Sequence, residues 1–338
     1  MNSTVSGPSL SIVVNNYNYA QFLAESLDNA LAQMCERDEL VVVDDGSTDE
    51  SAQVFERYLG RPGVRIINQE NQGQMKAVRV GIEAAEKDII VLLDSDDYFL
   101  PGYLDRLRRI YRENPDIDYV FCSPEVGGEP SASLFETCNA INRMKLKPGT
   151  VGATKWATIL FYEFVGVQTS GNSLTNDLAK TIMTLPTVLD DTRRLHPLLV
   201  RLFRISPHEA KKSGLTADGV IVRTASILGA RKFYDEEPGF MYRIHGGNKF
   251  ATVSTTGRRF LRYYWRSAFI STALRSFSIA KRPTAIELRE EILNRSFGQR
   301  SRRFLHIRAR YFLAAITSRG SIAKRLSAMA AAMGWKSR

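Results

Sequence analysis

The sequence predicts an α/β fold, in which a mostly parallel, doubly wound and twisted sheet carries helices on both faces and precedes a basic helical extension. Short apolar runs rich in β-branched residues alternate with segments of helical periodicity between residues 10 and 122. Charge is also unevenly spread along the chain. Of the net +10, residues 255–338 carry 19 Lys and Arg against 3 acids, a net of +16, which leaves −6 for residues 1–254.

The first predicted strand is 10–14, where apolar residues follow one another as in a strand buried on both faces. Runs of the same kind predict four further strands, at 39–43, 64–67, 89–93 and 119–122. Apolar stripes predict helices around 23–31 and 77–85.

Two signals predict where further helices begin. Ser47-Thr48-Asp49-Glu50 has the form of a capping box, and Pro101 suits a first helical turn. Because open α/β sheets bind ligands beyond the carboxyl ends of their strands, we expect the functional residues at those ends.

Composition excludes several classes of protein. With 338 residues, 44% apolar and 24% charged, the chain is expected to be globular with a sizeable core. Cys35, Cys122 and Cys138 are too scattered for a disulfide framework or a zinc site, which favours a reducing compartment. The N-terminus lacks a basic and an apolar signal region, so we expect a cytoplasmic protein.

Three strand ends carry polar residues that indicate a functional site. Asn15-Asn16-Tyr17-Asn18 follows the first strand, Asp44-Asp45-Gly46-Ser47 the second, and Asp94-Ser95-Asp96-Asp97 the fourth. Five carboxylates gathered at one edge repel each other unless a cation compensates them, and Mg²⁺ and Mn²⁺ prefer oxygen ligands completed by phosphates. The alternative for any single aspartate is a cap on the following helix.

In order and spacing, these motifs resemble the nucleotide-sugar domain of inverting GT-A-fold glycosyltransferases of family 2. The resemblance covers Ser11 to about Ser123. It rests on Ser11-Ile-Val-Val-Asn-Asn-Tyr-Asn18, Val43-Asp-Asp-Gly-Ser-Thr-Asp49, Asn71-Gln-Gly-Gln74 leading to Gly81-Ile82, and Asp94-Ser-Asp-Asp97.

The resemblance implies a nucleotide-diphospho-sugar donor, with UDP expected ahead of GDP and dTDP. It assigns Asp45 to the nucleobase, Asp94 to the ribose and the metal, and Asp96 to the Mn²⁺ or Mg²⁺ ion on the diphosphate. Asp44 and Asp97 would be supporting acids. The other donor-site residues that we expect are Asn15, Tyr17, Asn18, Gly46, Gln72, Lys76 and Ser95. Lys76 and Arg79 would offset diphosphate charge, or else lie solvated on a helix face.

A thinner resemblance to the same family covers the acceptor side, through Thr169–Ser173, Thr216–Asp218 and Tyr234–Asn248. It assigns the general base to Asp218, before an apolar helix expected at 219–228; a helix cap is the alternative role. Asp190-Asp191 is the rival base.

The motif Arg243-Ile-His-Gly-Gly-Asn248 is the third candidate on the acceptor side. Its glycines would let a phosphate approach the backbone. His245 would then complete the metal or diphosphate site, with Arg243 and Asn248 nearby, or else have a structural role.

We therefore divide the chain into a nucleotide-sugar half at 8–125, an acceptor half at 126–254 and a basic extension at 255–338. In the extension, Leu261, Tyr264, Trp265, Ala268 and Thr272 follow helical spacing, and Thr284-Ala-Ile-Glu287 predicts a second helix that runs into Arg300-Ser-Arg-Arg303. Cationic amphipathic helices bind anionic membranes, here the inner face, or pack on their own domain with charges in solvent.

The predicted activity is transfer of a sugar to a hydroxyl of a glycan, glycolipid or other acceptor. One alternative is a nucleotidyltransferase acting on sugar phosphates, but Asn15–Asn18 lacks the Gly and Lys of a triphosphate loop. Another is a non-catalytic nucleotide-sugar-binding relative. We expect no nucleic-acid binding, because the chain has no such motif and acids line the strand ends.

Overall fold

The computed structural model describes residues 7–128, 146–186, 201, 216–245, 256–294 and 302–333, with the backbone alone at 256–263 and 302–306. The chain forms two compact units. The first comprises 1–151, 166–183 and 230–248, and the second 152–165, 184–229 and 249–338.

The first unit is built on a mixed sheet. Its strands are β1 (Leu10–Asn16), β2 (Glu39–Asp44), β3 (Val64–Asn68), β4 (Ile89–Asp94), β5 (Tyr98–Phe99), β6 (Tyr119–Gly128), β7 (Gly149–Gly152), β8 (Asn172–Thr175) and β9 (Lys232–Ile244). Its helices are α1 (Ala20–Gln33), α2 (Ser51–Glu56), α3 (Gln74–Ala84), α4 (Tyr103–Glu113) and α8 (Asn176–Met183).

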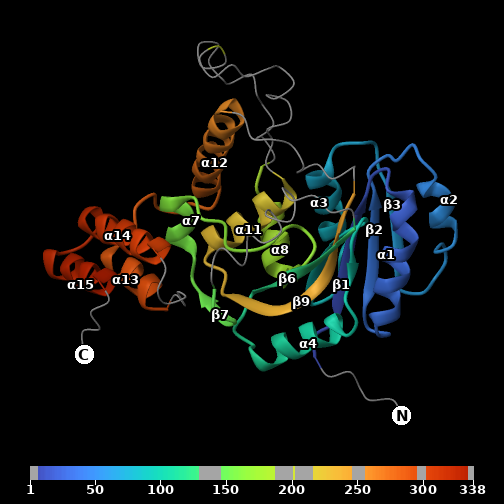
Figure 1. Ribbon diagram of the computed structural model, residues 1–338, viewed down its shortest axis with the longest axis horizontal. Helices are drawn as coiled ribbons and strands as arrows, with labels where there is room; N and C mark the ends of the chain where they lie inside the picture. Colours follow the sequence, from blue (N-terminus) through green and yellow to red (C-terminus); the bar gives the residue numbers. More distant parts are fainter. Residues whose placement is uncertain are drawn as a thin grey trace. The chain divides into compact units, whose positions relative to one another are not determined.

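The sheet order is β3-β2-β1-β4-β8-β6-β9-β5, with β7 paired to β9 (Figure 1). β1 pairs in parallel with β2 and β4, and β2 with β3. β8 runs antiparallel to both β4 and β6. The five predicted strands are confirmed as β1, β2, β3, β4 and β6.

Two predicted helix starts are wrong. Ser47–Glu50 is not a capping box: α2 begins at Ser51, and the Ser47 hydroxyl donates instead to Asp44 Oδ1 at 2.6 Å. Pro101 precedes α4, which begins at Tyr103 after Gly102 in the left-handed region (φ 76°). In both places the loop after the strand is longer than the sequence pattern indicates.

α3 packs directly on β1 and β2 through Gly81. A Cβ at this position would lie 2.4 Å from Val13 Cγ1 and 3.3 Å from Val43 Cγ2. Only a residue without a side chain allows this approach. The close packing places the first turn of α3, with Gln74, beside the carboxyl ends of the strands.

The second unit is helical. Its helices are α7 (Lys155–Phe161), α11 (Ala217–Leu228), α12 (Thr256–Ser276), α13 (Ala285–Asn294), α14 (Arg302–Thr317) and α15 (Ile322–Met333). The predicted capping box of α13 is confirmed: Glu287 Oε2 accepts from the Thr284 backbone N–H at 2.8 Å, and Thr284 Oγ1 accepts from the Glu287 N–H at 3.2 Å. The structure describes α13 as far as Asn294 and α14 from Arg302, so the predicted run into Arg300–Arg303 lies partly outside the described residues.

A buried carboxylate joins three of these helices. Glu291 on α13 accepts from the backbone N–H groups of Trp156 and Ala157, both at 2.8 Å, and from the Tyr311 hydroxyl at 2.6 Å. It thereby satisfies free donors at the start of α7 and fixes α14 to the same point.

The apolar side of α12 lies within the protein. Trp265 is 4% exposed, Phe269 is fully buried and Leu274 is 5% exposed. For this helix, the structure therefore favours packing on the chain itself over binding a membrane. Within the described residues, every helix is too short or too polar to span a bilayer.

Candidate active site

The candidate site begins at the carboxyl ends of β1, β2 and β4. β1 lies between the other two strands, with Asn16 in register with Asp44 and Asn15 with Asp94. The chain continues in the same pattern, since Asp45 N–H donates to Asn16 O at 2.9 Å and Ser95 N–H to Asn15 O at 3.3 Å. The sheet therefore brings the polar ends of all three strands to one edge.

Asp45 organises the loop that follows β3. Its Oδ1 accepts from the Gln72 N–H at 2.9 Å and from Gln69 Nε2 at 2.6 Å, and its Oδ2 accepts from the Gly73 N–H at 2.8 Å. The side chain is almost completely buried. Backbone and amide donors, rather than a cation, compensate this carboxylate.

Gly46 allows the chain to turn beside that loop. Its φ is 73°, and a Cβ there would lie 2.8 Å from the Asn71 backbone nitrogen. Both the left-handed backbone and the close approach require glycine.

Asp44 is held by a second hydrogen-bond group. Its Oδ2 accepts from the Ser47 N–H at 3.0 Å, and its Oδ1 accepts from Asn16 Nδ2 at 2.9 Å. Asn18, with φ 58°, donates its N–H to Ser47 Oγ at 2.9 Å and accepts from the Thr48 N–H at 2.7 Å. Asn16, which was quoted in the strand-end motif but not among the predicted site residues, links the group by also donating to Ser51 Oγ at 3.0 Å.

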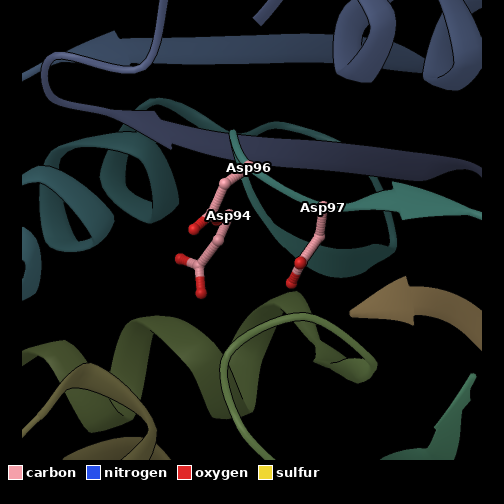
Figure 2. A group of neighbouring side chains, drawn as sticks. All are labelled: Asp94, Asp96 and Asp97. Atoms are coloured by element: carbon pink, nitrogen blue, oxygen red, sulfur yellow. The ribbon is translucent and has the colours of Figure 1, made fainter. Parts of the chain in front are cut away.

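The remaining three acids form a separate cluster after β4. Asp94, Asp96 and Asp97 each offer a carboxylate oxygen, and these oxygens lie within 4.8 Å of one another. Figure 2 shows the three carboxyl groups directed to the same side of the loop. The five predicted carboxylates thus lie at one edge of the sheet but form two groups. Asp44 and Asp45 are held by hydrogen-bond donors, whereas the carboxylates of Asp94, Asp96 and Asp97 lie close to one another.

Hydrogen bonds only partly offset the electrostatic repulsion within the cluster. Burial, and then the charges of Asp96 and Asp94, raise the pKa of Asp97 well above its ordinary value. Burial and the same three acids raise the pKa of Tyr19 to about 12. Asp97 Oδ2 is buried and has no hydrogen-bond partner among the described residues. An oxygen-rich cluster of this kind fits a divalent cation.

His245, at the end of β9, reaches this cluster. Its Nε2 lies 3.0 Å from Asp96 Oδ2. The ring makes an edge contact with Tyr19, at 5.4 Å between centroids, and a tilted contact with Phe22 at 4.7 Å. His245 therefore lies against one acid of the cluster and packs on two aromatic rings, one from α1 and one from the residue before it.

Arg243 supports the same corner. Its N–H donates to Asp97 Oδ1 at 3.1 Å, and its guanidinium pairs with Glu25 at 2.8 Å. The guanidinium also lies over the rings of Phe22 and Tyr98, at 4.7 and 5.2 Å from their centroids. It fixes the β9 backbone beside the acids.

Three residues that were not among the predicted site residues also contact the cluster. Gln74 Nε2 donates to Asp94 Oδ1 at 2.9 Å, and the Asp94 N–H donates to Ser170 Oγ at 3.0 Å. Tyr19 contacts the ring of His245 and is near enough to the acids for their charges to raise its pKa. Gln74 and Ser170 fall within motifs already quoted for the family resemblance, whereas Tyr19 has no sequence signal of its own.

The other predicted donor-site residues differ in exposure. Tyr17 is 39% exposed, Ser95 is buried, and Arg79 on α3 is partly buried. Lys76 Nζ donates to Gln72 Oε1 at 2.9 Å, so it contacts the loop held by Asp45. Asn248 and the rival base Asp190-Asp191 lie outside the described residues.

Asp218 belongs to the second unit, in the first turn of α11. The cap of this helix is Thr216, whose side chain accepts from the Gly219 N–H at 3.3 Å, so Asp218 is not the N-cap. Burial raises the pKa of Asp218, and the Thr216 hydroxyl, the Gly219 N–H and the Arg223 charge partly oppose that effect.

Arg223 lies one turn further along α11. It is 5% exposed, donates Nη1 to Gly219 O at 2.9 Å, and stacks on Phe164 at 5.0 Å. Burial and the charge of Arg266 lower its pKa to about 10. The carboxylate of Asp218 is therefore partly buried and has a cation near it.

Comparisons with known proteins agree with this geometry. The model of the family described as "Glycosyl transferase family 2" matches residues 11–152. An uncharacterized glycosyltransferase of Nostoc sp., alr2836, is 27% identical over 73% of this chain and 68% of its own. The putative glycosyltransferase EpsH of Bacillus subtilis is 32% identical over 34% of this chain, which spans only 33% of its length.

Solved structures extend the likeness to the whole fold. The crystal structure of residues 1–349 of S. aureus TarS in complex with UDP superposes with a TM-score of 0.52 at 16% identity, over 96% of this chain and 89% of that one. At this identity the likeness concerns the fold alone. Residues 11–152 therefore match the model of glycosyl transferase family 2, and the chain shares its overall fold with TarS.

Proposed function

We propose that this chain transfers a sugar from a UDP-sugar to a hydroxyl group of a glycan, a glycolipid or a similar acceptor, with inversion at the anomeric carbon. The observation that carries the proposal is the cluster of Asp94, Asp96 and Asp97 at the carboxyl edge of a sheet whose sequence matches family 2. TarS, which shares the fold, binds UDP, and this supports UDP as the nucleotide.

The donor occupies the edge formed by β1, β2 and β4 in this proposal. The Asp45 loop with Gln72 and Gly73 receives the base, and Asp94 lies toward the ribose. Asn15, Tyr17, Asn18, Asp44, Gly46, Lys76, Ser95 and Arg79 complete the donor side. Nucleotide binding must then compete with the hydrogen bonds that now engage Asp45.

The residues present fit a divalent cation, Mn²⁺ or Mg²⁺. Asp94 and Asp96 would bind the cation, and Asp97 would be a supporting acid beside them. His245 would be a further ligand or would orient Asp96. When bound, such a cation offsets the negative charge that develops on the leaving diphosphate. The buried, unpartnered oxygen of Asp97 and the mutual repulsion of the acids support this assignment.

Asp218 acts as the general base. It takes the proton from the acceptor hydroxyl while that oxygen bonds to the anomeric carbon and the bond from this carbon to the diphosphate oxygen breaks. Attack from the face opposite the leaving group inverts the configuration. The raised pKa of Asp218 supports the role, because it makes the carboxylate a stronger base.

Titration calorimetry of UDP, GDP and dTDP, with Mn²⁺ and again with chelator, tests the donor site. We expect UDP to bind and the affinity to fall in chelator. Absence of binding by all three nucleotides would overturn the proposal and favour an inactive relative without a donor site. With an acceptor in hand, a product that retains the anomeric configuration would disprove the inverting mechanism.

The place of action that we propose is the inner face of a membrane. The net charge of +16 in residues 255–338 supports it, since anionic headgroups attract such a segment. A lipid-linked or membrane-held acceptor would then lie at the same surface as the enzyme.

A further inference from the structure

Exposed apolar side chains concentrate on the C-terminal helices. Among the described residues nine large apolar side chains are exposed, and seven of them lie on α13, α14 and α15. These seven are Ile286, Leu293, Leu313, Ile316, Ile322, Leu326 and Met333. The three helices lie together near the C-terminus in Figure 1. Such a concentration marks an interaction surface.

α15 shows the arrangement most clearly. Ile322, Leu326 and Met333 are spaced at four and seven residues, which places them on one face of the helix, and they are 76%, 56% and 59% exposed. The opposite face, with Ala328, Ala331 and Ala332, is buried.

This orientation is the reverse of the one that folding alone favours. Burying isoleucine, leucine and methionine stabilises a fold more than burying alanine does. α15 instead packs its small residues inward and presents its large ones to solvent, so its outer face is suited to a partner.

The other two helices repeat the pattern. On α13, Ile286 and Leu293 lie seven residues apart and are 47% and 44% exposed. On α14, Leu313 and Ile316 lie three apart and are 63% and 45% exposed. Both spacings place the paired side chains on one side of their helix.

The same helices and the turns between them carry positive charge at the surface. Lys281 and Arg282, before α13, and Arg319, between α14 and α15, are exposed, as is Lys324 on the side of α15 away from Ile322 and Leu326. A helix that lies in the interface of an anionic bilayer has one apolar face and Lys or Arg on the rest of its surface.

We propose that the exposed apolar face of α13, α14 and α15 docks on an anionic lipid bilayer. A second copy of the chain is disfavoured as the occupant, because each copy carries +16 in this segment and the two would repel. α12 is not part of the face, because its apolar residues Trp265, Phe269 and Leu274 are already buried.

This inference deepens the membrane location in the proposed function, but it does not depend on the sugar-transfer chemistry. It can therefore be tested in the absence of donor and acceptor. A chain that does not bind UDP would refute the donor site but not the docking face. A chain that does not bind vesicles would refute the docking face but not the donor site.

The test is cosedimentation of the full chain with vesicles of phosphatidylcholine, alone or mixed with phosphatidylglycerol. We expect binding to the mixed vesicles, and weaker binding to pure phosphatidylcholine or at high salt. The double variant Ile322→Ser, Leu326→Ser should bind more than about tenfold more weakly, because it removes two inserting side chains.

Leu59→Ser is the matched control. Leu59 is 66% exposed but belongs to the first unit, so its loss should leave vesicle binding unchanged. Both variants change surface residues, and thermal unfolding verifies that each remains folded.

Three results would overturn the proposal. The first is a wild-type chain that does not bind phosphatidylglycerol vesicles, and the second is a double variant that binds them as the wild type does. The third is a dimer in sedimentation equilibrium that the double variant abolishes, since the face would then serve a second copy.

Discussion

His245 Nε2 lies 3.0 Å from Asp96 Oδ2, although 149 residues separate the two in the sequence. The contact joins the end of β9 to the loop after β4, and the rings of Tyr19 and Phe22 hold the imidazole in place. One carboxylate of the acid cluster is thereby oriented by a residue from the far end of the sheet. A partner that orients a metal ligand commonly matters nearly as much as the ligand.

His245→Ala should therefore weaken Mn²⁺ binding by about 10- to 100-fold, since it removes this orienting partner. Titration of Mn²⁺ into the protein with UDP present measures the effect. Leu59→Ser, which changes an exposed side chain outside the proposed donor site, is a control for disturbance of the surface. Unchanged Mn²⁺ affinity in His245→Ala would show that the histidine has a purely structural role.

Asp96→Ala should slow turnover by about 100-fold or more, as expected for the loss of electrostatic stabilisation at the leaving group. Release of nucleoside diphosphate from the UDP-sugar, followed with Mn²⁺ and with chelator, measures it. Glu25→Ala tests the surroundings without changing an acid of the cluster, because among the described residues the ion-pair partner of Glu25 is Arg243. Full activity of Asp96→Ala in chelator would contradict the metal assignment.

Asp218→Asn should reduce kcat by about 100-fold while UDP affinity stays unchanged, because the proposed base acts on the acceptor and not on the nucleotide. Comparison of kcat with the calorimetric Kd separates the two effects. Loss of UDP binding in this variant would place Asp218 in the donor site instead. Equal kcat in variant and wild type would transfer the role to another acid.

The pH dependence of kcat/KM follows from the same residue. Burial raises the pKa of Asp218 above its ordinary value of 3.8. Only the ionised carboxylate accepts a proton, so activity should fall as the pH is lowered through this raised pKa. Arg223→Gln removes a nearby positive charge that favours ionisation, so the acid limb should move to higher pH. A limb that stays in place would show that another group controls it.

The positions of five strands and the motifs at the strand ends could be predicted because each is a local feature of the sequence. Uninterrupted apolar runs mark β1, β2 and β4, and Asp44 and Asp94 directly follow such runs. The sequence could not predict that the five acids separate into two groups. That separation depends on the backbone N–H groups of Gln72 and Gly73, which reach Asp45 from a loop 27 and 28 residues away.

The same limit applies to α12 and α15. Both have amphipathic patterns, and periodicity alone does not say which face the fold covers. Contacts distant in sequence decide it: Trp265 and Phe269 of α12 are buried, whereas Ile322 and Leu326 of α15 are exposed.

Gly46→Ala should weaken UDP binding without unfolding the protein. Its Cβ would lie 2.8 Å from the Asn71 nitrogen, and its φ of 73° disfavours any side chain, so the loop beside Asp45 must shift. Calorimetry with UDP measures the loss. Gly60→Ala is the matched control, because Gly60 has the same φ of 73° and its Cβ would meet no atom within 4 Å. Equal UDP affinity in the two variants would remove the loop from the donor site.

Glu291→Gln should destabilise the helical unit by about 1–3 kcal/mol, because an amide in place of the carboxylate turns a donor toward groups that themselves donate. Three donors now converge on Glu291: the N–H groups of Trp156 and Ala157 and the hydroxyl of Tyr311. The urea concentration at the midpoint of unfolding, followed by the circular dichroism signal of the helices, measures the change. Glu290→Gln is the matched control, since Glu290 precedes it on the same helix and is exposed. If both variants unfold at the wild-type midpoint, the three hydrogen bonds do not hold α7, α13 and α14 together. Apolar packing around Phe161 and Tyr311 must then do so, since these two rings make an edge-to-face contact with 5.1 Å between their centroids.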